Sequence, residues 1–442
     1  MRDDTASTAP APPDVEPARR MGAFIDAAPS PFHACLEAAA RLEAAGFREL
    51  REVDAWAAAR GAFYVRRGGS LVAWAVGDHH RATDGFRVVG AHTDSPNLRV
   101  KPRPDAGRVG YRQLAVEVYG GALLNSWLDR DLGLSGRVVV RGADGPEERL
   151  LLIQRPLLRV PQLAIHLDRE ISSEGLRLNA QQHLSPIWGL GDPSPGGFAA
   201  FLAAELDVAP EGILAWDLMA HDLTPSALVG ADLEMISAPR LDNLCSSWAG
   251  VEAIVTSTSA ISELRQVPVL VLFDHEEIGS TSDRGADSAM LPALLERIVL
   301  GLGGGREESL RALAASVCLS ADNAHATHPN YADRHEPGHL IELNRGPVLK
   351  VNSNLRYATD AVSASAFLLA CEQAGVPHQR YAHRSDLPCG STIGPITASR
   401  LGISTVDVGA PQLAMHSSRE LGGSADPGFY TAAMAAFLAP SP

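Results

Sequence analysis

Histidine and carboxylate side chains recur in five short segments of the chain, in a combination that suits divalent metal ions. The segments read GAHTDSPNL, APRLDNL, LFDHEEIGS, SADNAHATHPNY and QLAMHSSRE. Each follows an apolar stretch or lies in a short loop, and none contains cysteine. Nitrogen and oxygen donors without thiolates favour a site for zinc, manganese or cobalt over a structural zinc site built from thiolates.

A pair of neighbouring metal ions, about 3.5–4 Å apart, requires a carboxylate that bridges them and further ligands for each ion. The five segments contain such a set. We assign Asp242 as the bridge. His92 and Asp322 are assigned to one ion. Glu277 and His416 are assigned to the other, so the expected cofactors are two divalent ions per subunit, zinc first and manganese or cobalt as alternatives.

The adjacent carboxylates Glu276 and Glu277 repel one another, and their placement at a strand end is costly unless a cation separates their roles. Glu277 is assigned to a metal ion, and Glu276 is assigned as the general base that removes a proton from the water attacking a carbonyl group. Asp94 follows His92 by two residues, so on an extended chain both project from the same side. Asp94 is therefore predicted to accept the second N–H of the imidazole and to fix its tautomer.

Each of these residues has a plainer explanation when it is taken singly. His92 could be a structural histidine, and Asp242 could cap the helix that follows it. The pair of adjacent glutamates could be solvated surface charge. The metal hypothesis is favoured because all five segments fall at expected strand ends, which meet in one crevice of an open α/β sheet.

Two other motifs point to different chemistry and are incomplete. GLGGGREE at residues 301–308 lacks the Lys-Ser/Thr pair of a phosphate-binding loop, so we predict a turn that ends a helix there. CGSTIG, around Cys389 and Ser391, could carry a nucleophile but lacks the G-x-S-x-G elbow. A triad hydrolase is therefore not favoured.

The elements expected to position these side chains are strands and helices on both sides of a β-rich segment. A helix is predicted from Ser30, as its cap, to Gly46, where it stops. Strands are predicted in SLVAWAVG and FRVVGAHTD. Further along, LDNLCSSWAGVEAIV predicts a helix with one apolar face, formed by Leu244, Trp248, Val251 and Val255.

The predicted fold class is α/β, with one domain split by another. Residues 18–97 and 236–442 alternate between helix and strand and are predicted to form the catalytic domain. Residues 98–235 contain short alternating segments separated by Gly, Pro and Asp turns, which predict an inserted β-rich domain. Residues 1–17 are rich in Pro, Ala, Asp and Thr and are predicted to be a disordered tail.

Composition limits the partners of the protein. The 442 residues carry 52 acidic and 38 basic side chains, a formal charge of -14, which argues against nucleic acid or an anionic membrane as the main partner. The sequence has no run of about 18 apolar residues and no apolar core of a signal peptide. Its five scattered cysteines form no disulfide framework or CxxC motif, so we expect a cytoplasmic protein.

The order of longer motifs resembles that of the aspartyl aminopeptidases, a family of the di-zinc metalloaminopeptidase superfamily. The motifs run from SPFHACLEAAARLEAAGF through GAHTDSPNLRVKP, LDRDLGLSGRVVV, PQLAIHLDR, RLDNL, HEEIGS, ADNAHATHPNY, GPVLKVNSNLRYAT and CGSTIGPI to MHSSRE. The resemblance implies a three-layer α/β/α di-zinc peptidase domain with a mixed sheet, interrupted by a barrel-like β-rich domain that serves oligomerisation. It also implies removal of N-terminal residues, preferentially Asp or Glu, from peptides.

The resemblance also adds residue roles. It matches the metal, base and orienting roles given above, and it implies that Lys350 and Tyr357 contact substrate. A lysine is a sensible counter-ion for a substrate carboxylate in a pocket of low dielectric constant. The family forms a tetrahedral dodecamer, and by resemblance His166 would enter a neighbouring subunit's site and stabilise the oxyanion there.

Two rival functions use the same residues. A related di-metal hydrolase could act on an N-acyl or small amide substrate, without recognising a free amino group. A non-catalytic oligomeric shell could use the metal ions only for folding, but it would not need Glu276.

Overall fold

The computed structural model describes residues 14–56 and 59–441. Residues 1–13 of the predicted tail lie outside this range. The first two residues of helix α1 (Glu16–Ala27) lie within the predicted tail, which is therefore too long at its C-terminal end. Pro17 lies in the first turn of α1, where the missing N–H of proline breaks no helical hydrogen bond.

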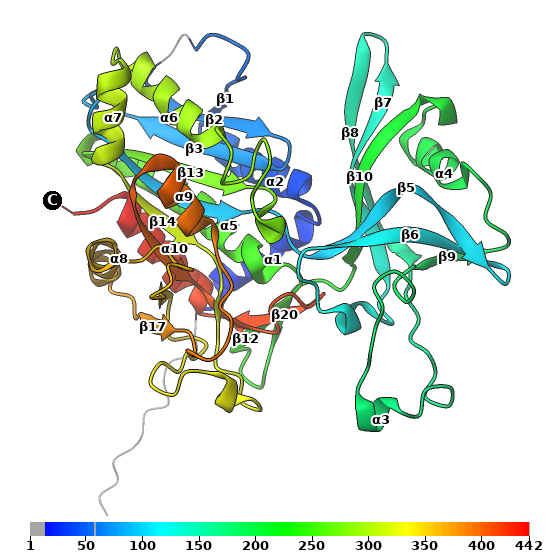
Figure 1. Cartoon of the computed structure of the whole chain (residues 1–442). Coiled ribbons are helices and arrows are strands. Elements are labelled where there is room, and N and C mark those ends of the chain that lie inside the picture. The colour runs from blue at the N-terminus through cyan, green and yellow to red at the C-terminus, as the bar shows by residue number, and fades with distance from the viewer. Residues whose placement is uncertain (1–13, 57–58, 442) are drawn as a thin grey trace, which may run out of the picture.

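A nine-stranded mixed sheet forms the centre of the larger part of the molecule (Figure 1). Its order is β1-β2-β3-β13-β4-β14-β18-β16-β17, and the neighbours β13, β4, β14 and β18 are parallel. The strands are β1 (Arg48–Glu49), β2 (Gly61–Arg67), β3 (Ser70–Val76), β4 (Phe86–His92), β13 (Val267–Phe273), β14 (Val317–Ala321), β16 (Val348–Val351), β17 (Gln379–Ala382) and β18 (Ser404–Gly409).

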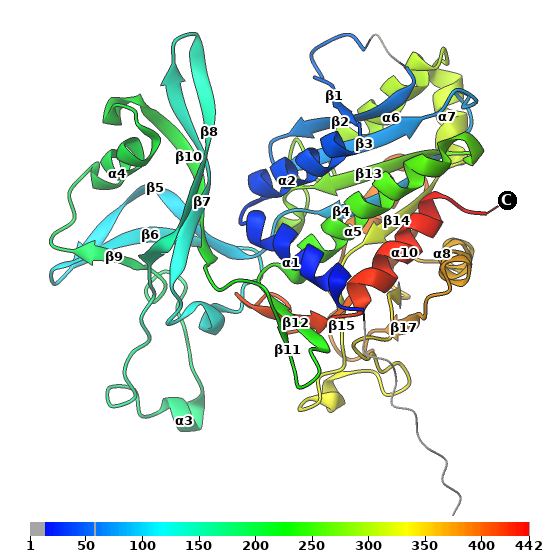
Figure 2. The same ribbon diagram turned by 180° about the vertical axis from the view of Figure 1, so that it is seen from behind.

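Helices cover both faces of this sheet and form the predicted three-layer α/β/α arrangement. One face packs against α1 and against α2 (Pro31–Ala44), α5 (Leu241–Ser257), α8 (Ala361–Ala374) and α10 (Asp426–Leu438), as Figure 2 shows. The other face packs against α6 (Met290–Gly301), α7 (Arg306–Ala314) and α9 (Ile393–Leu401). Within the described residues, no helix is both long and apolar enough to cross a membrane.

A second sheet of six antiparallel strands lies beside the first, in the order β8-β7-β10-β5-β6-β9 (Figure 1). Its two edges approach at an isolated bridge between Arg159 and Ile187 but do not pair as strands, so in the described part of the chain the expected barrel does not close. The elements are β5 (Asn97–Arg108), β6 (Tyr111–Tyr119), η1 (Leu124–Trp127), β7 (Leu132–Gly142), β8 (Gly145–Leu158), α3 (Ile171–Glu174), β9 (Ile187–Leu190), α4 (Gly197–Leu206), η2 (Pro210–Gly212) and β10 (Ile213–Asp222).

A small third sheet has the order β11-β12-β20-β19-β15. It holds the segment with His416, which lies between β19 and β20. Its strands are β11 (Ala227–Val229), β12 (Met235–Ala238), β15 (Ala324–His325), β19 (Pro411–Leu413) and β20 (Glu420–Gly423). Short 3-10 helices complete the fold: η3 (Thr258–Glu263), η4 (Glu276–Ile278) and η5 (Ala332–Arg334).

Local sequence signals place several helices correctly. The Ser30 hydroxyl accepts the backbone N–H of His33 at 3.4 Å and caps α2, which ends at Ala44, just before Gly46. Leu244 and Trp248 are fully buried on the predicted face of α5. These parts of the prediction are confirmed.

The glycine-rich run at residues 301–308 joins α6 to α7. Helix α6 ends at Gly301, and the Gly305 N–H before α7 donates to the Glu308 carboxylate at 2.8 Å. This is the predicted helix-ending turn, followed by a new helix start.

The buried side chain of His33 predicts how stability responds to acid. Burial and, to a smaller extent, the Arg240 charge lower the pKa of His33 to about 4. An unfolded histidine has a pKa of about 6.5. Between this pH and the lower pKa of the folded state, His33 is protonated in the unfolded chain but neutral in the folded chain. Stability is therefore lost as the pH falls from 6.5 towards 4, by about 2 kcal/mol at pH 5 from this residue.

His33→Asn removes this titration and keeps a polar group beside the Ser30 hydroxyl, which lies 2.7 Å from the imidazole Nδ1. Between pH 7.5 and pH 5 the free energy of unfolding should fall by about 2 kcal/mol less in the variant than in the wild type. Denaturant titrations measure both values, and His378→Asn, at an exposed histidine, is the control. An equal fall in wild type and His33→Asn would contradict the prediction.

Candidate metal centre

Three neighbouring parallel strands bring acidic and imidazole side chains to one edge of the large sheet. His92 is the last residue of β4, and Asp322 follows β14 directly. Glu276 and Glu277 form η4, which follows β13 after two residues. Because β13, β4 and β14 are adjacent and parallel, their carboxyl ends meet at the same edge.

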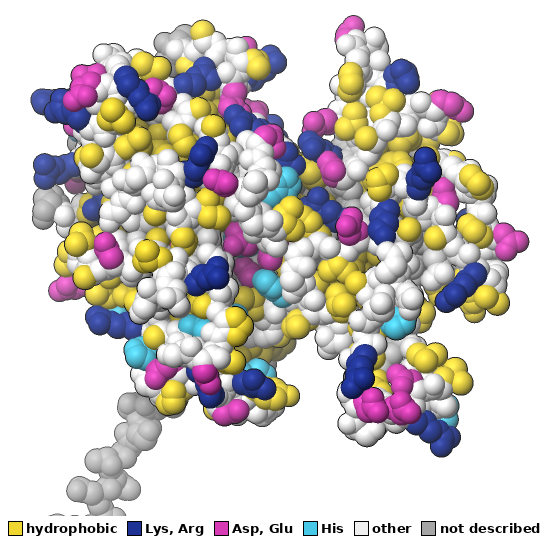
Figure 3. All heavy atoms as spheres, viewed as in Figure 1, with side chains coloured by type: hydrophobic (Ala, Val, Ile, Leu, Met, Phe, Trp, Pro, Cys, Tyr) yellow, Lys and Arg dark blue, Asp and Glu magenta, His cyan; other side chains and the backbone are white. Residues whose placement is uncertain are grey.

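Two further segments complete this cluster. Asp242 lies at the start of α5, and His416 lies in the turn between β19 and β20. The space-filling view shows acidic and histidine side chains in a hollow near the middle of this face (Figure 3). All five residues predicted as metal ligands therefore meet at one place.

The distances inside the cluster are those of atoms that share a cation. His92 Nε2 lies 3.5 Å from Asp242 Oδ1 and 3.7 Å from Asp322 Oδ1. His416 Nε2 lies 3.3 Å from Asp242 Oδ2 and 3.4 Å from Glu277 Oε2. Ordinary N–H···O hydrogen bonds are shorter, at about 2.7–3.2 Å, whereas two ligands of one tetrahedral zinc ion lie about 3.3 Å apart. The two oxygens of Asp242 thus face two different histidines.

The charge balance of the cluster also fits divalent cations. Asp242 Oδ1 and Glu277 Oε1 are buried and have no hydrogen-bond partner among the described residues. Burial raises the pKa of Glu277 well above its ordinary value, and the charges of Asp242 and Glu276 raise it further. Unpaired buried carboxylates are costly, and a cation between them would remove both the repulsion and the unsatisfied oxygens.

Glu276 also lies beside His92, but its side chain is more accessible to solvent than that of Glu277. Its Oε2 is 3.8 Å from His92 Nε2, and its side chain is 15% exposed against 3% for Glu277. Burial, opposed by His92 and reinforced by the Asp322 and Asp94 charges, raises the pKa of Glu276 to about 8. An accessible carboxylate with a raised pKa can take up a proton from a neighbouring group.

Asp94 organises the segment with the two glutamates. Its Oδ1 accepts the backbone N–H of Glu276, and its Oδ2 accepts that of Glu277, both at 3.1 Å. His92 Nδ1 lies 3.0 Å from the backbone oxygen of Asp94 and 3.5 Å from its carboxylate. The predicted acceptor for the imidazole is therefore in the expected residue, but the backbone oxygen is the nearer one.

Lys350 and Tyr357 also lie at the cluster. Lys350 is 2% exposed, and its ammonium donates to the backbone oxygens of Asp322, at 2.8 Å, and of Asn323, at 3.3 Å. The ammonium lies 5.0 Å from the centre of the Tyr357 ring. Burial opposes ionisation of Asp322, but the Lys350 charge and the His92 side chain lower the pKa of Asp322 to about 2.

His166 is placed apart from the cluster. It lies in the exposed stretch between β8 and α3, and it has no hydrogen bond or ion pair with the part of the chain that the structure describes. Leu163, Ile165 and Leu167 around it are 56%, 51% and 75% exposed.

Glu420 was not singled out by the sequence analysis, although it ends the motif MHSSRE. Its two oxygens accept the backbone N–H groups of Asp242, at 2.9 Å, and of His416, at 2.7 Å. It thereby joins the two segments that carry these residues. An acidic residue four positions after His416 was the only sequence signal for this role.

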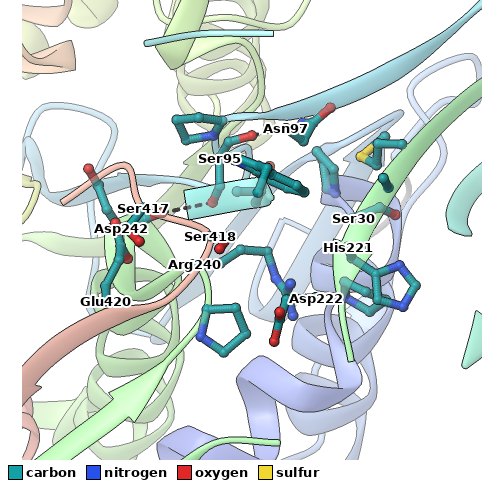
Figure 4. Close-up of a pocket in the computed structure, with 18 residues that line it drawn as sticks. Ser30, Ser95, Asn97, His221, Asp222, Arg240, Asp242, Ser417, Ser418 and Glu420 are labelled. Atoms are coloured by element: carbon teal, nitrogen blue, oxygen red, sulfur yellow. Dashed lines mark hydrogen bonds between the residues drawn. The ribbon is translucent and has the colours of Figure 1, made fainter. Parts of the chain in front are cut away.

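A small cavity adjoins the cluster on the side of Glu420 (Figure 4). Asp242 and Glu420 lie at one end, His221 and Asp222 at the other, and Arg240 between them. Its volume of about 20 Å³ is enough for one water molecule. The cavity is therefore too small to bind a molecule larger than water.

Comparisons with known proteins find relatives over almost the whole chain. A family model described as aminopeptidase I zinc metalloprotease (M18) matches residues 24–438. The probable M18 family aminopeptidase 2 of Streptomyces coelicolor is 54% identical over 418 residues, 94% of this chain and 96% of the relative. The protein of the same description from Mycobacterium tuberculosis strain H37Rv is 56% identical over 419 residues, with the same coverage.

Solved structures show the same fold. The structure described as the Ape4 and Nbr1 complex superposes with a TM-score of 0.92 at 36% identity, over 96% of this chain and 85% of that one. The S. cerevisiae mApe1 dodecamer superposes with a TM-score of 0.83 at 27% identity, over 96% of both chains. The motif resemblance is thus confirmed at the level of the family. The chain belongs to the aminopeptidase I zinc metalloproteases, M18, and is a peptide-bond hydrolase that acts as an aminopeptidase.

Proposed function

We propose that the chain is a two-metal aminopeptidase that prefers peptides beginning with Asp or Glu. The observation that carries the two-metal part is the placement of Asp242, whose oxygens lie 3.5 Å from His92 Nε2 and 3.3 Å from His416 Nε2. A carboxylate that faces two separate imidazoles at these distances is the expected bridge of a two-ion site.

The donor set divides between the ions around this bridge. His92 and Asp322 would hold one ion, Glu277 and His416 the other, and Asp242 both. When bound, such ions supply Lewis acidity, which polarises a carbonyl group and makes water a stronger acid. Zinc fits the family description, and manganese or cobalt would accept the same nitrogen and oxygen donors.

The side chains themselves perform the proton transfers and the positioning. Glu276 would remove a proton from the attacking water with its partly accessible carboxylate and return it to the leaving amine. Asp94 would hold the backbone of Glu276 and Glu277 in place through its two accepted N–H bonds. Tyr357 would line the substrate side beside Lys350.

The acidic preference rests on Lys350. The sequence contains only two lysines, and Lys350 is the one whose ammonium is buried beside the cluster. Two of its three N–H groups donate to backbone oxygens. The ammonium lies 3.9 Å from Asp322 Oδ2, and its third N–H would bind the substrate carboxylate. In a buried pocket this contact with Asp or Glu is worth more than at the surface.

Assembly is the further part of the proposal. The solved relative is described as a dodecamer, and the exposed apolar side chains Leu163, Ile165 and Leu167 suit burial against another subunit. We propose that the chain forms a homo-dodecamer in which His166 enters a neighbouring subunit's site, where it would stabilise the oxyanion. The residues 98–235 would then serve oligomerisation.

A peptide series with added zinc, manganese or cobalt tests the activity. Two ions per subunit and faster hydrolysis of an Asp-peptide than of a Leu-peptide are expected. Equal turnover of the two would overturn the acidic preference. Faster cleavage of the N-acetylated Asp-peptide would favour the rival N-acyl hydrolase.

Lys350→Met should change specificity more than it changes metal binding. We expect kcat/KM for the Asp-peptide to fall about 100-fold, the cost of leaving a buried substrate charge unpaired, and that for the Leu-peptide to fall much less. Lys101→Met, at the other lysine, which bonds Gln181 on the surface, is the matched control. An unchanged ratio of the two kcat/KM values in Lys350→Met would contradict the role.

A further inference from the structure

The turn between β6 and η1 belongs to the six-stranded sheet but touches the metal cluster of the large sheet. Tyr119 ends β6, and its hydroxyl donates to Asp94 Oδ2 at 2.6 Å. Two residues later, the Gly121 backbone oxygen accepts His416 Nδ1 at 3.1 Å. The Leu123 N–H then donates to the His416 backbone oxygen at 3.0 Å.

Tyr119 acts on the cluster through Asp94. The Asp94 oxygen that accepts the Tyr119 hydroxyl also accepts the Glu277 N–H. Tyr119 is 7% exposed, and the Arg99 guanidinium covers its ring at 3.8 Å, so burial and this contact hold its position. Its hydroxyl thereby restricts rotation of the carboxylate that holds Glu276 and Glu277.

Gly121 orients the second predicted metal-binding histidine, His416. A neutral imidazole carries one N–H and one free nitrogen. When His416 donates Nδ1–H to the Gly121 oxygen, Nε2 is left free toward Asp242 and Glu277. A bond of this kind fixes the tautomer and orientation of a metal-binding histidine.

Gly120, between these two contacts, lets the backbone approach Glu277. Its φ is +70°, and a Cβ built there would lie 3.1 Å from the Glu277 Cβ and 3.4 Å from its Oε2. Any side chain at this position would press on a predicted ligand. The turn therefore contacts both halves of the cluster within three consecutive residues.

We propose that residues 119–121 form a clamp through which the six-stranded sheet holds the metal-binding side chains in place, with Tyr119 as a positioning residue. The clamp rests on the proposed two-metal function. Its consequence is that metal affinity depends on the inserted β-rich segment, in addition to any role of that segment in assembly.

Tyr119→Phe tests the hydroxyl. We expect metal affinity, measured by competition with a chromophoric chelator on the full-length protein, to weaken about 10- to 100-fold, as when a group that orients a metal ligand is lost. Activity should return when zinc is raised above the weakened Kd. Tyr64→Phe is the matched control, because Tyr64 is also buried and donates to a carboxylate, Glu43, at 2.6 Å.

Gly120→Ala tests the close approach to Glu277. We expect it to weaken metal affinity as well, since the new methyl group must displace that side chain. Gly110→Ala is its matched control, because Gly110 has a φ of +77° with no atom within 4 Å of a built Cβ. Both substitutions strain the backbone, but only the first presses on the cluster.

The outcomes separate the clamp from the two-metal function. If the wild type holds two ions and Tyr119→Phe holds them with wild-type affinity, the clamp is wrong while the function stands. If Tyr64→Phe weakens metal binding as much as Tyr119→Phe does, the effect is general destabilisation and the clamp is also wrong. If the wild type binds no ions, the two-metal function fails first and the clamp with it.

Discussion

Glu276→Gln is expected to lower kcat by about 10²–10⁴-fold, the contribution of a positioned general base, while the metal content stays at the wild-type level. An amide cannot take up the proton, yet it keeps the size of the side chain. The backbone N–H of residue 276 still donates to Asp94 in the variant. Steady-state kinetics and metal analysis of the same preparation measure the two quantities.

The control for this variant is Glu342→Gln, at a glutamate whose side chain is 71% exposed, and its kinetics should match the wild type. Loss of bound metal in Glu276→Gln would make Glu276 a ligand, since its Oε2 lies 3.8 Å from His92 Nε2. Unchanged turnover in Glu276→Gln would show that Glu276 is not the general base. Loss of assembly in Glu276→Gln, together with no activity in the wild type, would support the non-catalytic shell.

Asp242→Asn is expected to weaken metal binding on the order of 100-fold or more, beyond the effect of losing an orienting group. The substitution removes the charge that faces both histidines and turns one of its oxygens into an N–H donor. A saturating metal at 100 times its Kd stabilises the folded wild type by about 2.7 kcal/mol per site. In thermal unfolding, zinc should therefore raise the Tm of the wild type strongly and that of the variant only slightly.

Asp426→Asn is the matched control for this substitution. Asp426 is 1% exposed, lies at the start of α10 and accepts the backbone N–H groups of Asn344 and Gly346, so the same chemical change occurs away from the cluster. Its zinc-dependent shift should equal that of the wild type. A full shift in Asp242→Asn would contradict the bridging assignment.

Helices with strong local signals could be predicted, whereas several others were missed, among them α1, α4, α7 and α9. Helix α2 has a serine cap, an early proline and a terminal glycine, which act within a few residues of one another. Helix α1 was not predicted, although Ala18, Met21, Phe24 and Ile25 recur at helical spacing and are buried. Pro17 is a helix-start signal, but it directly follows a proline-rich stretch whose composition is typical of a disordered tail.

The closure of the six-stranded sheet could not be predicted from its sequence pattern. Alternating residues identify strands such as β6 and β7, but a barrel also requires a matching stagger between its first and last strands. Here β8 and β9 approach at one bridge, between Arg159 and Ile187, without further pairing. The stagger depends on the register of every strand pair, which local patterns do not encode.

For the site, residue type and strand periodicity were enough to identify which donors gather, because the ends of adjacent parallel strands meet at one edge. His92, Asp322 and the two glutamates lie at such strand ends. Asp242, at the start of α5, and His416, between β19 and β20, do not, although a strand end was expected for each. The directions in which loop side chains point cannot be predicted in this way, because they depend on the order of strands and on contacts between segments far apart in the chain. Folding therefore decided that Asp242 faces two histidines, that Asp94 turns to the glutamate backbone, and that Tyr119 from another sheet reaches Asp94.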